Sequence, residues 1–192
     1  MGTAPLIILS GPAGSGKTTL VERVLREDPH PLCVSVSATT RPPRPGELDG
    51  VHYHFWTPER FERGIAAGEF LEYAQVHRRH YYGTLRRDVD DQLARGRGVI
   101  LVIDVQGAAK VRALRPDVVS VFLQAPSLEE YERRLILRGD DPASIAVRLE
   151  TARRELERIG EYKYVIVNDD LDRAVADFRA VIARHFEPKG GD

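Results

Sequence analysis

The sequence predicts an α/β fold built on a mostly parallel sheet. Three apolar runs, LIIL, VILVI and YVIV, are nearly uninterrupted, which is typical of strands covered on both faces of such a sheet. Helical patterns lie between several of these runs, and this alternation favours helices packed against parallel strands. The 192 residues suffice for one domain with a substantial core.

Apolar runs predict five strands, and amphipathic patterns predict four helices. The expected strands cover residues 5–9, 32–36, 99–104, 118–124 and 164–167. The expected helices cover residues 18–27, 88–95, 128–137 and 143–159. Pro142 ends one helical pattern, and either Asp141 or Ser144 can cap the next.

The segment from residue 37 to about residue 96 interrupts this alternation. It is rich in Pro, Gly, Arg and aromatic residues, and its runs VHYHFW and GEFLEYAQVHRRHYYG resemble short strands joined by turns. It contains too many aromatic residues for a disordered linker. We therefore predict an inserted module, with Phe55, Trp56 and Phe61 in its small core.

Composition argues against several classes of protein. The net charge of -1 provides no overall field for nucleic acid or a membrane surface. No apolar run is long enough to span a membrane, and the N-terminus lacks the pattern of a signal peptide. The single cysteine, Cys33, excludes a disulfide framework. We expect a cytoplasmic protein that binds neither nucleic acid nor membrane.

The run GPAGSGKT, residues 11–18, matches the phosphate-loop pattern G-x-x-x-x-G-K-[ST] between an expected strand and an expected helix. Glycine lets the backbone approach a phosphate closely, and the helix N-terminus adds partial positive charge. Lys17 is expected to reach the β- and γ-phosphates, and the Thr18 hydroxyl to bind Mg²⁺. The motif alone does not separate a kinase from a GTPase, an ATPase or an inactive relative.

Arg41 and Arg44 lie among prolines in the run TTRPPRPG. Prolines stiffen an extended backbone, and paired guanidiniums suit a phosphate monoester because both form forked hydrogen bonds. Tyr53 and Tyr82 offer further hydroxyl donors. The alternative is an ordinary basic surface loop.

Six stretches together resemble guanylate kinase, in that family's order and spacing over almost the whole chain. They are GPAGSGKTTL, SVSATTRPPRPGELDGVHYHF, GEFLEYAQVH, YYGT, IDVQGA and VIVNDDLD. The resemblance implies a P-loop NTPase-type three-layer sandwich with an inserted small mixed α+β module and a short helical lid. It divides the chain into a core of residues 1–36 and 97–192, a GMP-binding insert of residues 37–96 and a lid of residues 137–150.

The resemblance also implies transfer of the γ-phosphoryl group of ATP to GMP, giving ADP and GDP, with Mg²⁺ as the cofactor. The expected partners are ATP and GMP or dGMP, and the chain is expected to be a monomer or a weak homodimer. Two alternatives remain. One is a phosphopeptide-binding module of the kind found in scaffold proteins, and the other is a kinase for another small phosphorylated acceptor, such as a ribose bisphosphate.

The resemblance assigns some residues to the GMP phosphate, some to guanine, and four more to the GMP site in general. The GMP phosphate is assigned to Arg41, Arg44, Tyr53 and Tyr82. Guanine is assigned to Ser37, Glu72 and Thr84, and the GMP set is completed by Glu47, Gly83, Asp104 and Gly107. A carboxylate can accept from both the ring N–H and the exocyclic amine of guanine, whereas adenine would place a ring acceptor against it.

The residues implied for ATP comprise the phosphate loop, three arginines and a loop after the last strand. The loop residues are Gly11, Pro12, Ala13, Gly14, Ser15, Gly16, Lys17, Thr18 and Thr19, with Asn168 and Asp169 on the adenine side. For Asn168 and Asp169, an ordinary Asx turn is the alternative. Lys17 and the lid arginines Arg134, Arg138 and Arg148 are the expected catalytic residues, because phosphoryl transfer depends on positioning and charge stabilisation. Arg133 fits a solvated neighbour.

Asp104 ends the apolar run VILVID, and ligands bind at strand ends in open α/β sheets. It is expected to orient GMP or a water on Mg²⁺, and it can also cap the following helix. Val102 stands where the resemblance leads us to expect an acidic residue. The segment between Arg138 and Arg148 is one residue shorter than the family pattern.

Overall fold

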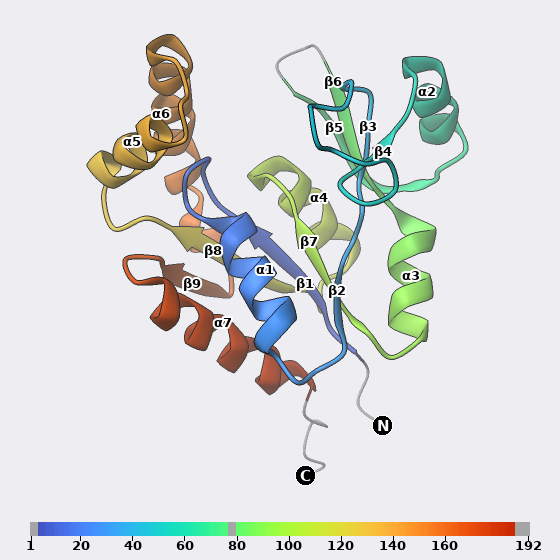
Figure 1. The fold of residues 1–192 in the computed structure, drawn as a ribbon. Coiled ribbons are helices and arrows are strands. Elements are labelled where there is room, and N and C mark those ends of the chain that lie inside the picture. The colour runs from blue at the N-terminus through green and yellow to red at the C-terminus, as the bar shows by residue number, and fades with distance from the viewer. Residues whose placement is uncertain (1–3, 77–79, 187–192) are drawn as a thin grey trace.

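The computed structural model describes residues 4–76 and 80–186, which form a three-layer core and a second, smaller sheet beside it (Figure 1). The core sheet has the order β2-β7-β1-β8-β9, and every neighbouring pair is parallel. Its strands are β1 (Leu6–Ser10), β2 (Leu32–Val34), β7 (Gly98–Val102), β8 (Val119–Gln124) and β9 (Tyr164–Val167). The predicted α/β class is confirmed. The expected strand 99–104 was too long, because the chain turns into a helix after Val102.

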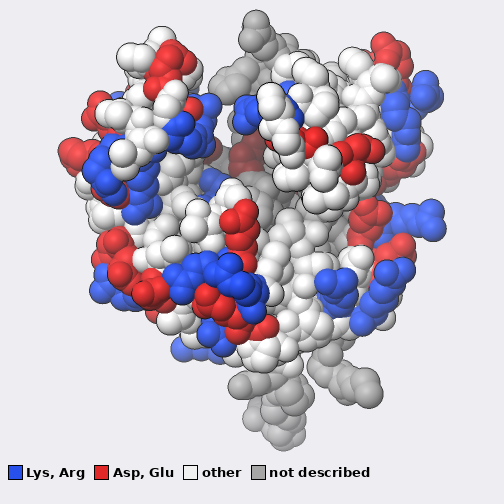
Figure 2. Space-filling model, in the orientation of Figure 1, with Lys and Arg blue, Asp and Glu red and all other residues white. Residues whose placement is uncertain are grey.

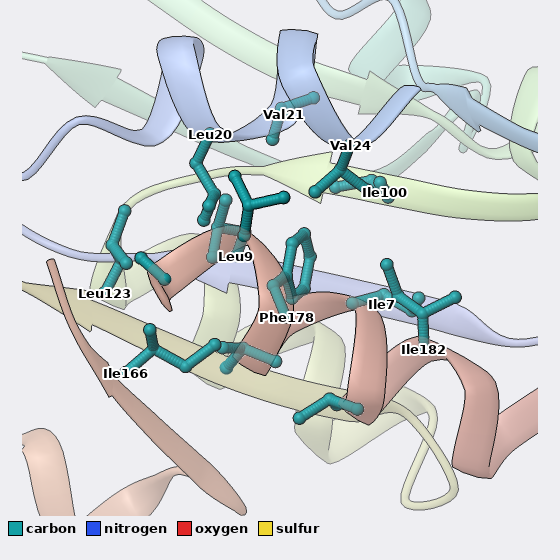
Figure 3. Close-up of a cluster of buried hydrophobic side chains, with 14 of the residues drawn as sticks. Ile7, Leu9, Leu20, Val21, Val24, Ile100, Leu123, Ile166, Phe178 and Ile182 are labelled. Atoms are coloured by element: carbon teal, nitrogen blue, oxygen red, sulfur yellow. The ribbon is translucent and has the colours of Figure 1, made fainter. Parts of the chain in front are cut away.

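Helices α1 (Lys17–Glu27) and α7 (Leu171–Phe186) cover one face of the core sheet (Figure 1). Successive side chains of a strand point to opposite faces, so Ile7 and Leu9 of β1 meet these helices. Figure 3 shows this cluster, in which the labelled helical residues are Leu20, Val21, Val24, Phe178 and Ile182.

Helices α3 (Arg86–Ala94) and α4 (Val105–Leu114) cover the opposite face. Leu6 and Ile8 of β1 pack there with Val89 of α3 and Val111 of α4. Neither α4 nor α7 was among the predicted helices. In α7 the buried residues recur with helical spacing, at Ala174, Val175, Phe178, Val181 and Ile182, so its pattern was present in the sequence.

The smaller sheet has the order β4-β3-β6-β5 and lies beside the core (Figure 1). Its strands are β3 (Ala38–Thr39), β4 (His54–Phe55), β5 (Phe70–Val76) and β6 (His80–Leu85), and β6 runs antiparallel to β3 and β5. Helix α2 (Pro58–Ala66), which was not predicted, packs Phe61 on Phe70 with ring centroids 4.3 Å apart. Trp56 joins this cluster as expected, whereas Phe55 lies beside Tyr53, with centroids 5.9 Å apart.

Helices α5 (Leu128–Leu137) and α6 (Pro142–Leu156) stand on the other side of the core from the small sheet (Figure 1). The predicted helix 143–159 ends earlier than expected, and the 3-10 turn η1 (Ile159–Glu161) follows it. Asp141 caps α6 by accepting from the Ser144 backbone N–H at 3.0 Å, which decides between the two expected caps. Among the described helices, none combines the length and apolar character needed to cross a membrane.

Candidate active site

Parallel strands place their carboxyl ends at one edge of the sheet, and ligands bind at such edges. The phosphate loop follows β1, Asp104 lies two residues after the end of β7, and Asn168 follows β9 directly. Figure 2 shows that the molecule is hollowed above this edge, between the α5–α6 pair and the small sheet. Ala13 of the phosphate loop, Arg148, Asp104 and several of the predicted GMP residues line cavities in this region.

The phosphate loop has three glycines with positive φ, and at two of them a Cβ would also clash with neighbouring atoms. Gly11 and Gly16 have φ of 145° and 95°. A Cβ at Gly11 would lie 2.0 Å from the Leu123 carbonyl oxygen, and a Cβ at Gly16 would lie 2.4 Å from Asn168 Nδ2. Gly16 is the N-cap residue of α1, and no side chain in the described part of the protein caps the start of that helix. Its first backbone N–H groups therefore remain available to an anion.

Lys17 lies half-buried beside the loop. Its ammonium donates to the carbonyl of Gly11 and, at 3.0 Å, to that of Pro12. Burial lowers the pKa of Lys17 to about 8, and the nearby carboxylates of Glu155 and Asp104 oppose that shift. Thr18 and Thr19 are exposed on the first turn of α1.

Asn168 braces the phosphate loop from the end of β9. Its side-chain amide donates to the Ser15 backbone carbonyl at 2.8 Å, and its backbone carbonyl accepts from Arg134 Nη2 at 2.7 Å. Only 6% of Asn168 is exposed. Asp169 is exposed, pairs with Arg173 and accepts from the Asp170 backbone N–H at 2.7 Å. Asn168, predicted on the adenine side, therefore contacts the loop that is predicted to hold phosphate.

The three predicted lid arginines occupy two different places. Arg134 lies against the phosphate loop, where Nη1 is 3.4 Å from the carbonyls of both Gly14 and Ser15. Its Nε donates to Glu130 at 2.7 Å. Arg138 caps the end of α5, and Arg148 lies on α6. Arg133 is exposed and pairs with Glu130, as a solvated neighbour would.

Arg138 and Arg148 meet at one carboxylate, that of Asp140. Asp140 Oδ2 is 2.8 Å from Arg138 Nη2 and 3.6 Å from Arg148 Nε. Arg148 also lines a cavity of about 520 Å³ between α6 and Ala13 of the phosphate loop. Glu155, the next-to-last residue of α6, lines the same cavity.

The arginines predicted for the GMP phosphate are held by Glu47. Its carboxylate accepts from Arg41 Nη2 at 2.8 Å and from the Arg44 backbone N–H at 2.7 Å. These two hydrogen bonds lower the pKa of Glu47 to about 2. The Arg41 guanidinium lies over the ring of Tyr53 at 5.5 Å, and the Tyr53 and Tyr82 rings meet edge to face at 5.8 Å. The Arg44 side chain is exposed.

A cavity of about 260 Å³ separates the small sheet from the end of β7. Most of the predicted GMP residues line it, namely Ser37, Tyr53, Glu72, Tyr82, Gly83 and Asp104. Val102 and Ala74, which were not assigned to GMP, line it too.

Glu72 is the buried carboxylate of this cavity, with 7% of the residue exposed. It accepts from the Thr84 hydroxyl at 2.8 Å, and burial raises its pKa. Gly107 allows this placement, because a Cβ there would lie 2.7 Å from Glu72 Oε2. Gly83 is likewise needed for packing, since a Cβ would lie 2.6 Å from the ring of Phe70.

Asp104 combines the two roles that its position allows. Its carboxylate caps α4 by accepting from the backbone N–H groups of Gln106 at 2.9 Å and Gly107 at 2.8 Å. It also lines the Glu72 cavity and a neighbouring one of about 480 Å³, which Glu155 shares. The cavity of about 480 Å³ therefore lies between the other two, because it shares Asp104 with the Glu72 cavity and Glu155 with the cavity next to the phosphate loop.

Three carboxylates of the site were not assigned from the sequence. Glu130 supports Arg134, and the i,i+4 spacing of that pair would have indicated it. Asp140 lies two residues from Arg138, but its approach to Arg148 and the position of Glu155 near the phosphate loop depend on the packing of α6, which no local spacing signals.

Comparisons with known proteins agree with the resemblance. The family model described as guanylate kinase matches residues 3–185. The chain is 49% identical over 184 residues to the guanylate kinase of Vibrio parahaemolyticus, covering 95% of this chain and 88% of that protein. It is 50% identical over 179 residues to the guanylate kinase of Mannheimia succiniciproducens, covering 92% of this chain and 86% of that protein. The crystal structure of guanylate kinase from Anaplasma phagocytophilum matches with a TM-score of 0.81 at 32% identity, covering 98% of this chain and 89% of that chain.

Proposed function

Because the chain belongs to the guanylate kinase family, we propose how its residues transfer the γ-phosphoryl group of ATP to GMP, giving ADP and GDP. One observation carries the assignment of roles. A phosphate loop and a cavity with a buried carboxylate, Glu72, lie at the same edge of the core sheet, with Asp104 between them.

ATP binds with its phosphates on the loop of residues 11–19. The uncapped start of α1 offers backbone N–H groups, and Lys17 exchanges its carbonyl partners for phosphate oxygens. Asn168 stabilises the shape of the loop through its hydrogen bond to the Ser15 carbonyl, and Arg134 holds Asn168 in place by donating to its backbone carbonyl. Asp169 lies at the adenine end.

GMP binds in the cavity of about 260 Å³. Arg41, Arg44, Tyr53 and Tyr82 hold its phosphate, and Glu47 keeps Arg41 in place before GMP arrives. Glu72 accepts from the guanine ring N–H and exocyclic amine, while Ser37 and Thr84 supply hydroxyl groups. Glu72 must be ionised for this contact, and its raised pKa assists proton uptake when the site is empty.

Transfer proceeds by in-line attack of a GMP phosphate oxygen on the γ-phosphorus of ATP, without a covalent enzyme intermediate. Lys17, Arg134, Arg138 and Arg148 stabilise the negative charge that is spread over the transferred group. Closure of the lid and the insert excludes water, which would otherwise accept the phosphoryl group.

The residues present fit a magnesium ion. Thr18 exposes a hydroxyl on the first turn of α1, and Asp104 offers a carboxylate at the adjoining strand end. No cluster of three His, Cys, Asp or Glu residues suited to a metal occurs in the described part of the chain. Mg²⁺ at nucleotide sites takes most of its ligands from phosphates and water, so one hydroxyl and one outer carboxylate suffice. When bound, it neutralises charge on the β- and γ-phosphates.

Product formation from Mg·ATP with GMP, dGMP, AMP, CMP and UMP tests this assignment. We expect rapid formation of GDP, little transfer to AMP, CMP or UMP, and loss of activity in Lys17→Ala. Equal activity with a ribose bisphosphate would favour the sugar-phosphate alternative. Tight phosphopeptide binding by folded protein that transfers nothing would favour the binding module.

A further inference from the structure

The turn between α5 and α6 places an acidic residue against two arginines of the lid. Gly139 follows the C-cap residue of α5, Arg138, with φ 83°, and its N–H donates to the Ile136 carbonyl at 2.9 Å. The next N–H, that of Asp140, donates to the Leu135 carbonyl at 3.2 Å. This pair of bonds is a Schellman motif, which determines the direction of the chain at Asp140.

The two neighbouring aspartates of this turn have separate functions. Asp141 accepts from the backbone N–H of Ser144 at 3.0 Å and from its hydroxyl at 2.6 Å, so it caps α6. Asp140 instead turns toward Arg138 and Arg148, and only 16% of its side chain is exposed.

Both guanidiniums approach the same oxygen of Asp140. Arg138 Nη2 lies 3.1 Å from Oδ1 and 2.8 Å from Oδ2, and Arg148 Nε lies 3.6 Å from Oδ2. The two arginines come from different helices and carry like charges, so they repel one another unless an anion lies between them. Arg148 at the same time lines the cavity next to Ala13 of the phosphate loop.

We propose that Asp140 is a positioning residue, which holds Arg138 and Arg148 together, with Arg148 at the cavity next to Ala13 of the phosphate loop, before ATP binds. Long arginine side chains lose rotamer freedom when they bind phosphate, and a contact that orders them beforehand reduces this cost. The inference rests on the proposed roles of the two arginines in phosphoryl transfer. It adds a residue that touches neither substrate.

The test compares Asp140→Asn with Asp141→Asn in the full-length protein. Both changes remove one negative charge from the same turn without changing side-chain shape. Asn caps helices as well as Asp does, so Asp141→Asn leaves α6 intact and both arginines with Asp140. Thermal unfolding of both variants shows whether the lid region remains folded.

We expect Asp140→Asn to lower kcat for GDP formation about tenfold, the size expected when two long side chains are ordered only during the reaction. KM for GMP should change less than about twofold, because the arginines lie away from the Glu72 cavity. Asp141→Asn should retain the wild-type kcat.

A double-mutant cycle with Arg138→Ala separates positioning from general stability. If Asp140 acts through Arg138, the effect of Asp140→Asn should shrink to about threefold or less in the Arg138→Ala background. Full additivity, or equal effects of Asp140→Asn and Asp141→Asn, would overturn the proposal. A lower KM for ATP with unchanged kcat in Asp140→Asn would do so as well, since Asp140 would then only compete with the phosphates. Absence of GDP formation by the wild-type protein would instead refute the proposed function.

Discussion

The side-chain amide of Asn168 donates a hydrogen bond of 2.8 Å to the backbone carbonyl of Ser15. Because Asn168 follows β9 and Ser15 lies in the loop after β1, this bond joins two chain segments 153 residues apart. The shape of the phosphate loop therefore depends on the last strand of the sheet.

Asn168→Ala should lower the free energy of unfolding by about 1–3 kcal/mol, because the buried Ser15 carbonyl loses its donor. The KM for ATP should rise while the KM for GMP stays nearly constant. Chemical denaturation and steady-state kinetics measure both effects. A stable variant with a normal KM for ATP would show that the loop keeps its shape without this bond.

Arg134→Ala should reduce the rate of GDP formation by about 10³-fold or more, since Arg134 both contacts the phosphate loop and is assigned to the transferred group. Arg133→Ala is the matched control. It removes an exposed arginine that pairs with the same glutamate, Glu130, and its rate should stay within about twofold of the wild type. Similar losses in both variants would argue that Glu130 pairing, and not contact with the loop, is what matters.

Glu72→Gln should lower kcat/KM for GMP about 10²-fold, because two hydrogen bonds from guanine to a carboxylate are weakened. The same variant should be more stable than the wild type at neutral pH. Burial raises the pKa of Glu72 in the folded state, so the folded chain binds more protons than the unfolded chain above the ordinary carboxylate pKa, and stability falls as pH rises through that window.

Denaturation at pH 4 and pH 8 measures this difference between wild type and Glu72→Gln. Glu69→Gln serves as control, since Glu69 pairs with Arg60 and does not line the Glu72 cavity. If Glu72→Gln kept full activity with GMP, Glu72 would not read guanine.

The second-order rate constant for ATP should fall above about pH 8, as Lys17 loses its proton in the nucleotide-free enzyme. Lys17→Arg should lack this alkaline decline at its lower activity, because a guanidinium stays protonated. The effect of Lys17 on the pH dependence of stability has the opposite sign to that of Glu72. Between about pH 8 and 10.5 the unfolded lysine, with a pKa near 10.5, still holds a proton that the folded lysine has lost. Lys17 therefore makes the free energy of unfolding rise with pH in this range. An unchanged alkaline limb in Lys17→Arg would assign the decline to another group.

Asp104→Asn should separate helix capping from metal handling. Asn accepts the same backbone hydrogen bonds, so the free energy of unfolding should change by less than about 0.5 kcal/mol. The Mg²⁺ concentration for half-maximal activity should rise about 10-fold or more, as is typical when an outer-shell carboxylate is lost. A lower kcat with unchanged Mg²⁺ dependence would indicate that Asp104 orients GMP and has no role toward Mg²⁺.

The sequence locates parts of the candidate site where the pattern of residues is local. The phosphate loop depends on glycine spacing and on one strand and one helix that are contiguous in sequence, so Gly11 to Thr18 identify it directly. The α/β class and four of the helices followed from periodicity. Helix α7 was not predicted although its apolar spacing is regular, and only the cap of α4, Asp104, was predicted.

The sequence alone determined the fold class, the phosphate loop and, through the resemblance, the family and its reaction, because each is encoded in short patterns of residue type and spacing. Tertiary structure alone decided which distant groups meet. It gave Asn168 a contact with Ser15, placed Glu72 against Gly107, and joined Arg138 and Arg148 through Asp140. The first two contacts join segments that are far apart in the sequence, and the third depends on how α6 packs beside α5 across a short turn. Neither kind of packing leaves a pattern of residue spacing in the sequence.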